Sequence, residues 1–115
     1  MTLLKEWQNR LGLQDWHITL LENCRPENMS MQDVAGCTTW TESTKSAVIE
    51  ILDEKFLPKG AAARPYDFER TLVHELLHCK MSLLSDDDQS VQYRVCHQII
   101  DDLARALVDA KRSST

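Results

Sequence analysis

The chain has 115 residues, of which 43% are hydrophobic and 27% are charged, and its formal net charge at pH 7 is −5. That length suits one domain with a modest core, and that balance is typical of a globular protein. The acidic charge argues against binding to nucleic acid or to anionic membranes, and no stretch approaches the roughly 18 apolar residues that cross a bilayer. We therefore expect a single domain over residues 1–115 with no nucleic-acid or membrane partner.

The first residues and the cysteines indicate a reducing compartment. The N-terminal segment lacks the basic residues and the long apolar run of a signal peptide, so we expect a cytoplasmic protein. The cysteines Cys24, Cys37, Cys79 and Cys96 include no Cys-x-x-Cys pair. A cysteine-based zinc site needs such close pairs, and disulfides are rare in the cytoplasm. We expect free thiols without a functional role; two disulfides are the alternative in a secreted chain.

The N-terminal residues predict a helix followed by a strand. Residues 2–11 place apolar side chains at helical spacing, Thr2 suits the N-cap, and Gly12 suits the position that ends a helix. Residues 15–21 alternate apolar and polar side chains, which is typical of a half-buried strand. His17 falls on the polar side of that strand, and we interpret it as a surface residue.

Two further strands are predicted after a polar loop at residues 22–33. Residues 35–41 and 46–52 are rich in β-branched and aromatic side chains. Gly36 weakens the prediction for the first of these strands. Residues 42–45 between them have the composition of a turn, so the two strands predict a hairpin.

The segment from residue 67 to residue 84 carries the most informative pattern. It predicts a helix with Asp67 as N-cap and an apolar stripe along one face. Within it, His74, Glu75 and His78 form the pattern His-Glu-x-x-His. Histidines four residues apart lie one turn above each other on a helix, where two neutral imidazoles can bind one zinc ion. Glu75 lies beside them, where a carboxylate can accept a proton from water on the metal. The alternative is a pair of histidines on an exposed helix flank.

Connecting segments precede and follow that helix. Residues 53–65 contain two prolines and a glycine and predict an exposed connection that borders a cleft. Residues 85–88 are Ser-Asp-Asp-Asp, which we interpret as the cap of the next helix, because the glycine and glutamate of a calcium loop do not follow. Residues 88–111 then predict a final helix with an apolar stripe.

A catalytic zinc site needs a third protein ligand, and the final helix offers candidates. His97 comes near the histidine pair if that helix returns antiparallel to the helix that carries the motif. Asp101, one turn further on, is the rival ligand, and a histidine packed at a helix–helix contact without metal is the other alternative. If His97 binds the metal, Asp101 or Asp102 can orient a ligand.

These segments resemble the zincin metallopeptidases, most closely the minimal gluzincin-like and SprT-like domains of small bacterial and phage proteins. The likeness rests on residues 69–78 around the motif, on residues 97–107 and on the strand that begins at Trp16. It implies an α+β fold with a small, three-stranded, mainly antiparallel sheet, an N-terminal helix and two C-terminal helices that carry the metal site. Gluzincins have a glutamate where His97 stands here, so a site of three histidines departs from their pattern.

The resemblance implies a zinc-dependent metallopeptidase, with Glu75 as the general base for a water that attacks a peptide carbonyl. An extended peptide would pair antiparallel with a sheet edge, for which residues 46–52 are the candidate. Tyr66 and Tyr93 are candidate oxyanion donors, although a structural role suits each better. The alternative function is a non-hydrolytic, zinc-binding interaction module, against which Glu75 argues because a metal site alone needs no such carboxylate. A DNA-linked protease is disfavoured by the acidic charge.

Overall fold

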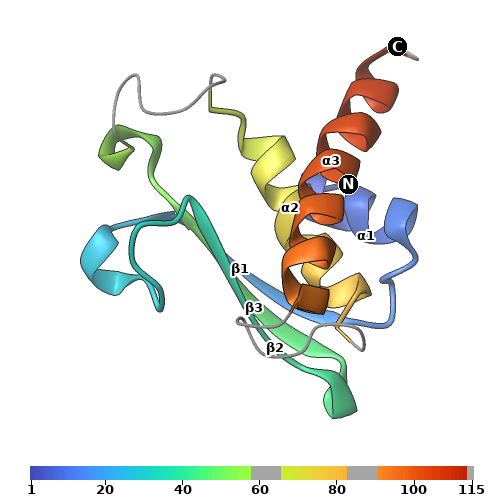
Figure 1. Cartoon of the computed structure of the whole chain (residues 1–115), viewed down its shortest axis with the longest axis horizontal. Helices are drawn as coiled ribbons and strands as arrows, with labels where there is room; N and C mark the ends of the chain where they lie inside the picture. Colours follow the sequence, from blue (N-terminus) through green and yellow to red (C-terminus); the bar gives the residue numbers. More distant parts are fainter. Residues whose placement is uncertain (58–65, 83–90, 114–115) are drawn as a thin grey trace.

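The computed structural model describes residues 1–57, 66–82 and 91–113, and of residues 91–93 it describes only the backbone. In this part of the chain, three helices gather on one face of a three-stranded sheet (Figure 1). The protein is therefore a small α+β domain. No described helix is long and apolar enough to span a bilayer. The elements are α1 (Leu3–Leu11), β1 (His17–Cys24), β2 (Gly36–Thr41), β3 (Ser46–Leu52), α2 (Phe68–Lys80) and α3 (Val91–Ser113).

The helix starts confirm the predicted caps. The Thr2 hydroxyl accepts a hydrogen bond from Lys5 N at 3.2 Å, and an Asp67 carboxylate oxygen accepts one from Arg70 N at 3.2 Å. Gly12 ends α1 with φ of 70°, a left-handed conformation that glycine adopts without strain. The predicted cap at residues 85–88 lies outside the described residues.

The sheet is mixed, so the prediction of a mainly antiparallel sheet is wrong. The strand order is β1-β3-β2, with β1 parallel to β3 and β2 antiparallel to it. The chain leaves β1 and crosses to the far side of β3 before it forms β2, and the predicted β2–β3 hairpin is confirmed. Because β3 has a neighbour on each side, the prediction that residues 46–52 form an edge for a peptide is also wrong.

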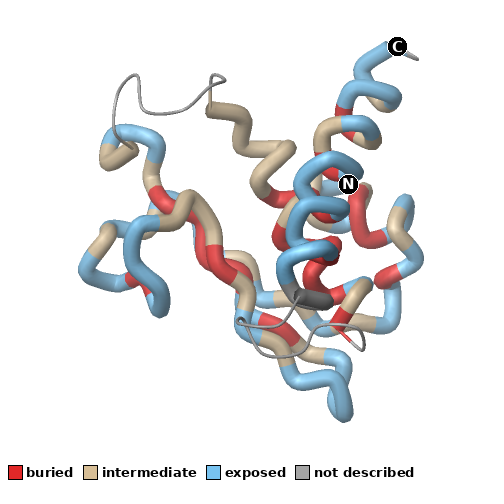
Figure 2. The backbone as a smooth tube through the Cα atoms, viewed as in Figure 1, coloured by how far each residue is buried: buried red, intermediate tan, exposed pale blue. Residues whose placement is uncertain are grey.

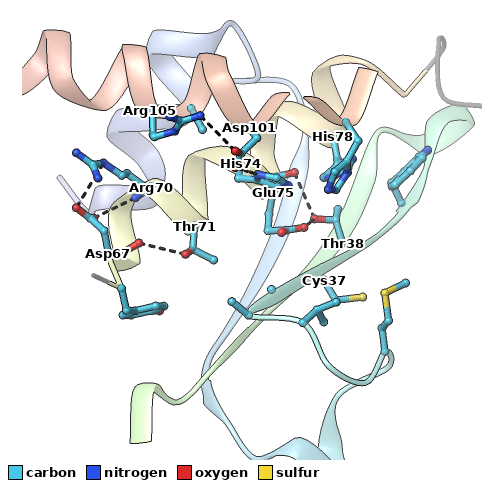
Figure 3. A pocket seen from close by; sticks show the side chains of 18 residues that line it. Cys37, Thr38, Asp67, Arg70, Thr71, His74, Glu75, His78, Asp101 and Arg105 are labelled. Carbon is cyan, nitrogen blue, oxygen red and sulfur yellow. Dashed lines mark hydrogen bonds and ion pairs between the residues drawn. The ribbon is translucent and has the colours of Figure 1, made fainter. Parts of the chain in front are cut away.

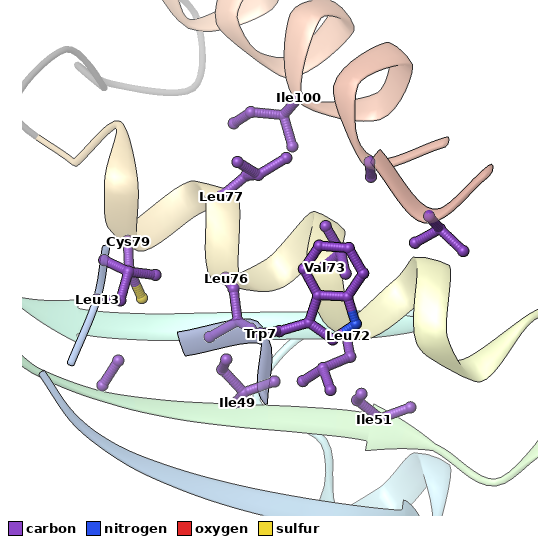
Figure 4. Close-up of a cluster of buried hydrophobic side chains, with 13 residues drawn as sticks. Trp7, Leu13, Ile49, Ile51, Leu72, Val73, Leu76, Leu77, Cys79 and Ile100 are labelled. Carbon is purple, nitrogen blue, oxygen red and sulfur yellow. The ribbon is translucent and has the colours of Figure 1, made fainter. Parts of the chain in front are cut away.

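The core lies between α2 and one face of the sheet. β3 turns alternate side chains toward α2, as expected from the two-residue period of a strand. Figure 2 shows buried positions along β3 and on the inner sides of the helices. Figure 4 shows the cluster, whose largest fully buried members include Trp7, Leu13, Ile49, Ile51, Leu72, Val73, Leu76 and Ile100.

Helix α3 runs back along α2, and this return determines where its residues meet the motif. Arg70 at the start of α2 binds Asp109 near the end of α3 at 2.7 Å, and Asp67 binds Arg112 at 2.6 Å. Exposed ion pairs stabilise little on their own, so the buried contacts of Ile100 with α2 contribute more to the packing. With these ends joined, the first turns of α3 lie beside the last turns of α2.

Candidate metal centre

Three histidines from two helices converge where the first turns of α3 lie beside the C-terminal half of α2. The possible ligand atoms of His74, His78 and His97 all lie within 4.8 Å of one another. The ring centroids are 5.2 Å apart for the first two, and His97 lies 5.1 Å and 5.4 Å from them. Among the described residues this is the one group of histidine, cysteine or acidic side chains so arranged. The structure brings the predicted ligands together, and their binding of a metal stays a prediction.

The helices present these rings differently. His74 and His78 are one turn apart on the flank of α2 beside its buried stripe, so the first is half-buried and the second buried. His97 extends from the exposed side of α3. The group thus has two inner rings, His74 and His78, and one outer ring, His97, and all three border a pocket.

The electrostatic surroundings keep the two inner rings neutral. Burial, together with the neighbouring imidazoles, lowers the pKa of His78 to about 4. Burial, together with the neighbouring ring of His97, lowers the pKa of His74, and Asp101 partly opposes this. Neutral imidazole is the form that binds a metal. The buried Nδ1 of His78 has no hydrogen-bond partner among the described residues, so the group fits a divalent cation.

The predicted rival ligand, Asp101, lies beside the three-histidine group rather than in it. One of its carboxylate oxygens is 3.5 Å from His74 Nδ1. Its other oxygen accepts a hydrogen bond from Arg105 at 3.4 Å, and Arg105 also binds Asp102 at 2.6 Å. A carboxylate next to a ring nitrogen can orient that ring, which is the secondary role expected for Asp101.

Glu75 is buried between α2 and β2, where only 6% of its surface is exposed. The Thr38 hydroxyl of β2 donates a hydrogen bond to Glu75 Oε1 at 2.7 Å (Figure 3). Burial raises the pKa of Glu75 to about 7, and the hydrogen bond from Thr38 partly opposes that rise. A carboxyl group with this pKa exchanges a proton near neutral pH.

A pocket of about 440 Å³ lies next to the histidines and Glu75. It lies between α2, α3 and β2, and Figure 3 shows the side chains of these elements converging on it. From β2, Trp40 stacks on the ring of His78 with centroids 6.2 Å apart and planes inclined by 14°. Other residues that line it include Gly36, Thr38, Tyr66, Arg70 and Arg105. The pocket therefore borders both the imidazoles and the carboxylate.

The cysteines do not contribute ligands to this group. All four cysteines are free thiols, as the sequence predicts. Cys37 lines the pocket, but burial raises its pKa, and burial raises the pKa of Cys79 to about 12. Since the thiolate is the form that binds metals, these protonated thiols are poor ligands.

Of the two candidate oxyanion donors, Tyr66 and Tyr93, the structure describes the side chain of Tyr66 alone. Tyr66 lines the pocket, and burial raises its pKa, so its phenol keeps the proton that a donor needs. The side chain of Tyr93 lies outside the described residues.

No protein-family model, curated protein or solved structure matches the chain. Three convergent imidazoles are a ligand set for a catalytic metal, and a buried carboxyl group that exchanges a proton near neutral pH is a suitable general base. The contributions of Thr38, Gly36 and Trp40 were not predicted, because they come from a strand far from the motif in the sequence.

Proposed function

We propose that the protein is a zinc-dependent metallopeptidase with a zincin-like arrangement of sheet, motif helix and returning helix. The observation that carries this proposal is the buried carboxylate of Glu75 beside the three-histidine group. His74, His78 and His97 would hold the ion, which when bound lowers the pKa of a water and polarises a carbonyl oxygen. A site that only stored metal or stabilised the fold would need no buried carboxylate facing a pocket.

In this function Glu75 takes a proton from the attacking water and returns it to the leaving amine. The Glu75 carboxylate, buried beside the pocket, can accept the proton before attack and hold it until the amine leaves. The Thr38 hydroxyl lies 2.7 Å from Glu75 Oε1 and 3.3 Å from the main-chain oxygen of Glu75. It can donate to the carboxylate, or to the main-chain oxygen while the carboxyl group holds the proton.

The corrected sheet order provides a different edge for an extended peptide. Within the described residues, β2 pairs only with β3, so its other edge is open beside the pocket. Leu52 N donates to Ala35 O at 2.9 Å, and antiparallel pairs alternate between bonded and non-bonded. By that alternation, Gly36, Thr38 and Trp40 direct their main-chain groups outward. A peptide that pairs with this edge would pass in front of Glu75.

The likeness to zincins belongs to the same proposal. Two features support it, namely the position of His-Glu-x-x-His on a helix packed on the sheet and the third histidine on the helix that follows. His97 in place of a glutamate leaves the site with more positive charge, which should make a bound zinc ion more Lewis-acidic.

Glu75→Gln tests the proposal, since glutamine keeps the shape of the side chain but cannot act as a base. We expect one zinc per chain in both proteins, and cleavage of a library of unstructured peptides that falls at least about 100-fold in the variant. Glu22→Gln, an exposed change on β1, is the matched control and should cleave as the wild type does. If both proteins bind zinc and the wild type, like the variant, cleaves no peptide, the peptidase is contradicted and a zinc-binding interaction module is supported.

A further inference from the structure

We propose that Thr38 is a positioning residue for Glu75, an inference that rests on the proposed peptidase function. Its hydroxyl is, among the described residues, the one side-chain donor to that carboxylate. The contact joins β2 to α2 across 37 positions of the chain, so it depends on the fold and not on the motif helix. In Figure 3 the Thr38 side chain points from the strand to Glu75.

The place of Thr38 in the strand fixes the direction of its hydroxyl. Thr38 lies in the middle of β2, opposite Ile49 of the central strand, and its two neighbours Cys37 and Thr39 pair with that strand on either side of it, which fixes its backbone. A β-branched side chain in a strand has few allowed χ1 rotamers. The donor therefore approaches Glu75 from a fixed point, and the buried carboxylate has little other solvation to orient it.

Gly36 completes this arrangement on the same face of β2, two residues before Thr38. A Cβ atom at residue 36 would lie 3.0 Å from Glu75 Oε2 and 3.1 Å from Glu75 Cγ. The strand thus holds one carboxylate oxygen with a hydroxyl group and leaves room for the other by lacking a side chain. Neither oxygen can move far without losing the donor or meeting the backbone of β2.

This arrangement has a consequence for catalysis. The outward main-chain groups of Thr38 belong to the strand edge on which a peptide would pair, while its side chain holds the base. Substrate and base are then positioned by one rigid residue, and small displacements of reacting groups are costly. Loss of the hydroxyl should therefore lower kcat more than it raises KM.

Thr38→Val tests the inference, because valine keeps the shape of threonine without the donor. With zinc content unchanged, we expect kcat to fall at least about tenfold with little change in KM. Thr38→Ser, which keeps the hydroxyl, should restore kcat to within about threefold of the wild type. Thr39→Val is the matched control: this exposed residue is next in the strand and points to the opposite face, so its kcat should not change. Equal activity of Thr38→Val and Thr39→Val would overturn the inference.

A second measurement decides the question without activity. Denaturant unfolding of the zinc-free protein, with Thr38→Val and Glu75→Leu alone and together, gives the coupling between the two side chains. We expect the unfolding constant of the double variant to differ by at least about fivefold from the product of the two single effects. For Thr39→Val with Glu75→Leu, we expect the double variant to equal that product. If the wild type cleaves no peptide, the proposed function fails. Coupling would then still support the Thr38–Glu75 contact, and additivity would overturn it.

Discussion

The pocket has two sides that differ in burial and in polar contacts. The β2 side includes Gly36, Thr38 and Trp40. The α3 side includes His97, Asp101 and Arg105. The β2 side meets the buried Glu75 through one short hydrogen bond and close packing. The α3 side is more exposed, and its Asp101 lies between His74 and Arg105, 3.5 Å from the ring nitrogen and 3.4 Å from the guanidinium. In the proposed function, β2 would position the base and α3 would supply the third metal ligand.

The largest effect is expected from a residue of α2 that both sides share. His78→Ala removes a proposed ligand, which is buried and whose ring stacks on Trp40. Zinc affinity, measured by competition with a chelator, should fall more than about 100-fold. His17→Ala, an exposed histidine on β1, is the control and should bind zinc as the wild type does. Equal affinities for the two variants would refute the site.

Removal of the α3 ligand should have a smaller effect. His97→Ala leaves the pair on α2 intact and leaves Asp101 one turn away as a nearby carboxylate. We expect zinc affinity to fall about 10- to 100-fold, while Gln98→Ala, an exposed neighbour on α3, keeps wild-type affinity. Unchanged affinity for His97→Ala would show that α3 does not complete the ligand set.

The smallest effect on metal binding is expected from the β2 side. In Gly36→Ala, the added methyl group would lie 3.0 Å from Glu75 Oε2 and 3.1 Å from Thr71 Cγ2, so both side chains must shift by a few tenths of an ångström. We expect kcat to fall about tenfold and zinc affinity to stay at the wild-type value. A loss of zinc with normal turnover per bound zinc would reverse the roles that we assign to the two sides.

The sequence predicts the site residues that lie on helices, two from the spacing within one helix and one from the pairing of two helices. Spacing alone puts His74 and His78 on one face, and the antiparallel return of α3 brings His97 to them. Thr38 was not predictable in this way, because its contact depends on which strand lies beside α2. In the sequence, Gly36 weakens the prediction of a strand, but a glycine inside a strand also marks the close approach of another group, here Glu75.

In the sheet, too, the sequence predicts local features but not the long-range pairing of strands. The bounds of β3 were predicted as Ser46–Leu52, and the hairpin with β2 followed from the short turn. The parallel pairing of β1 with β3 is a long-range contact that no local pattern encodes. One signal was present, since residues 46–52 form a nearly continuous apolar run and a central strand is buried on both faces.

X-ray absorption spectroscopy of the zinc-loaded protein tests the central claim most directly, because it reports the type and distance of the ligand atoms. The account predicts one zinc per chain with three imidazole nitrogens at about 2.0–2.1 Å and no sulfur, and one imidazole fewer in His97→Ala. A zinc ion with cysteine sulfur ligands, or with the same number of imidazoles in His97→Ala as in the wild type, would contradict it.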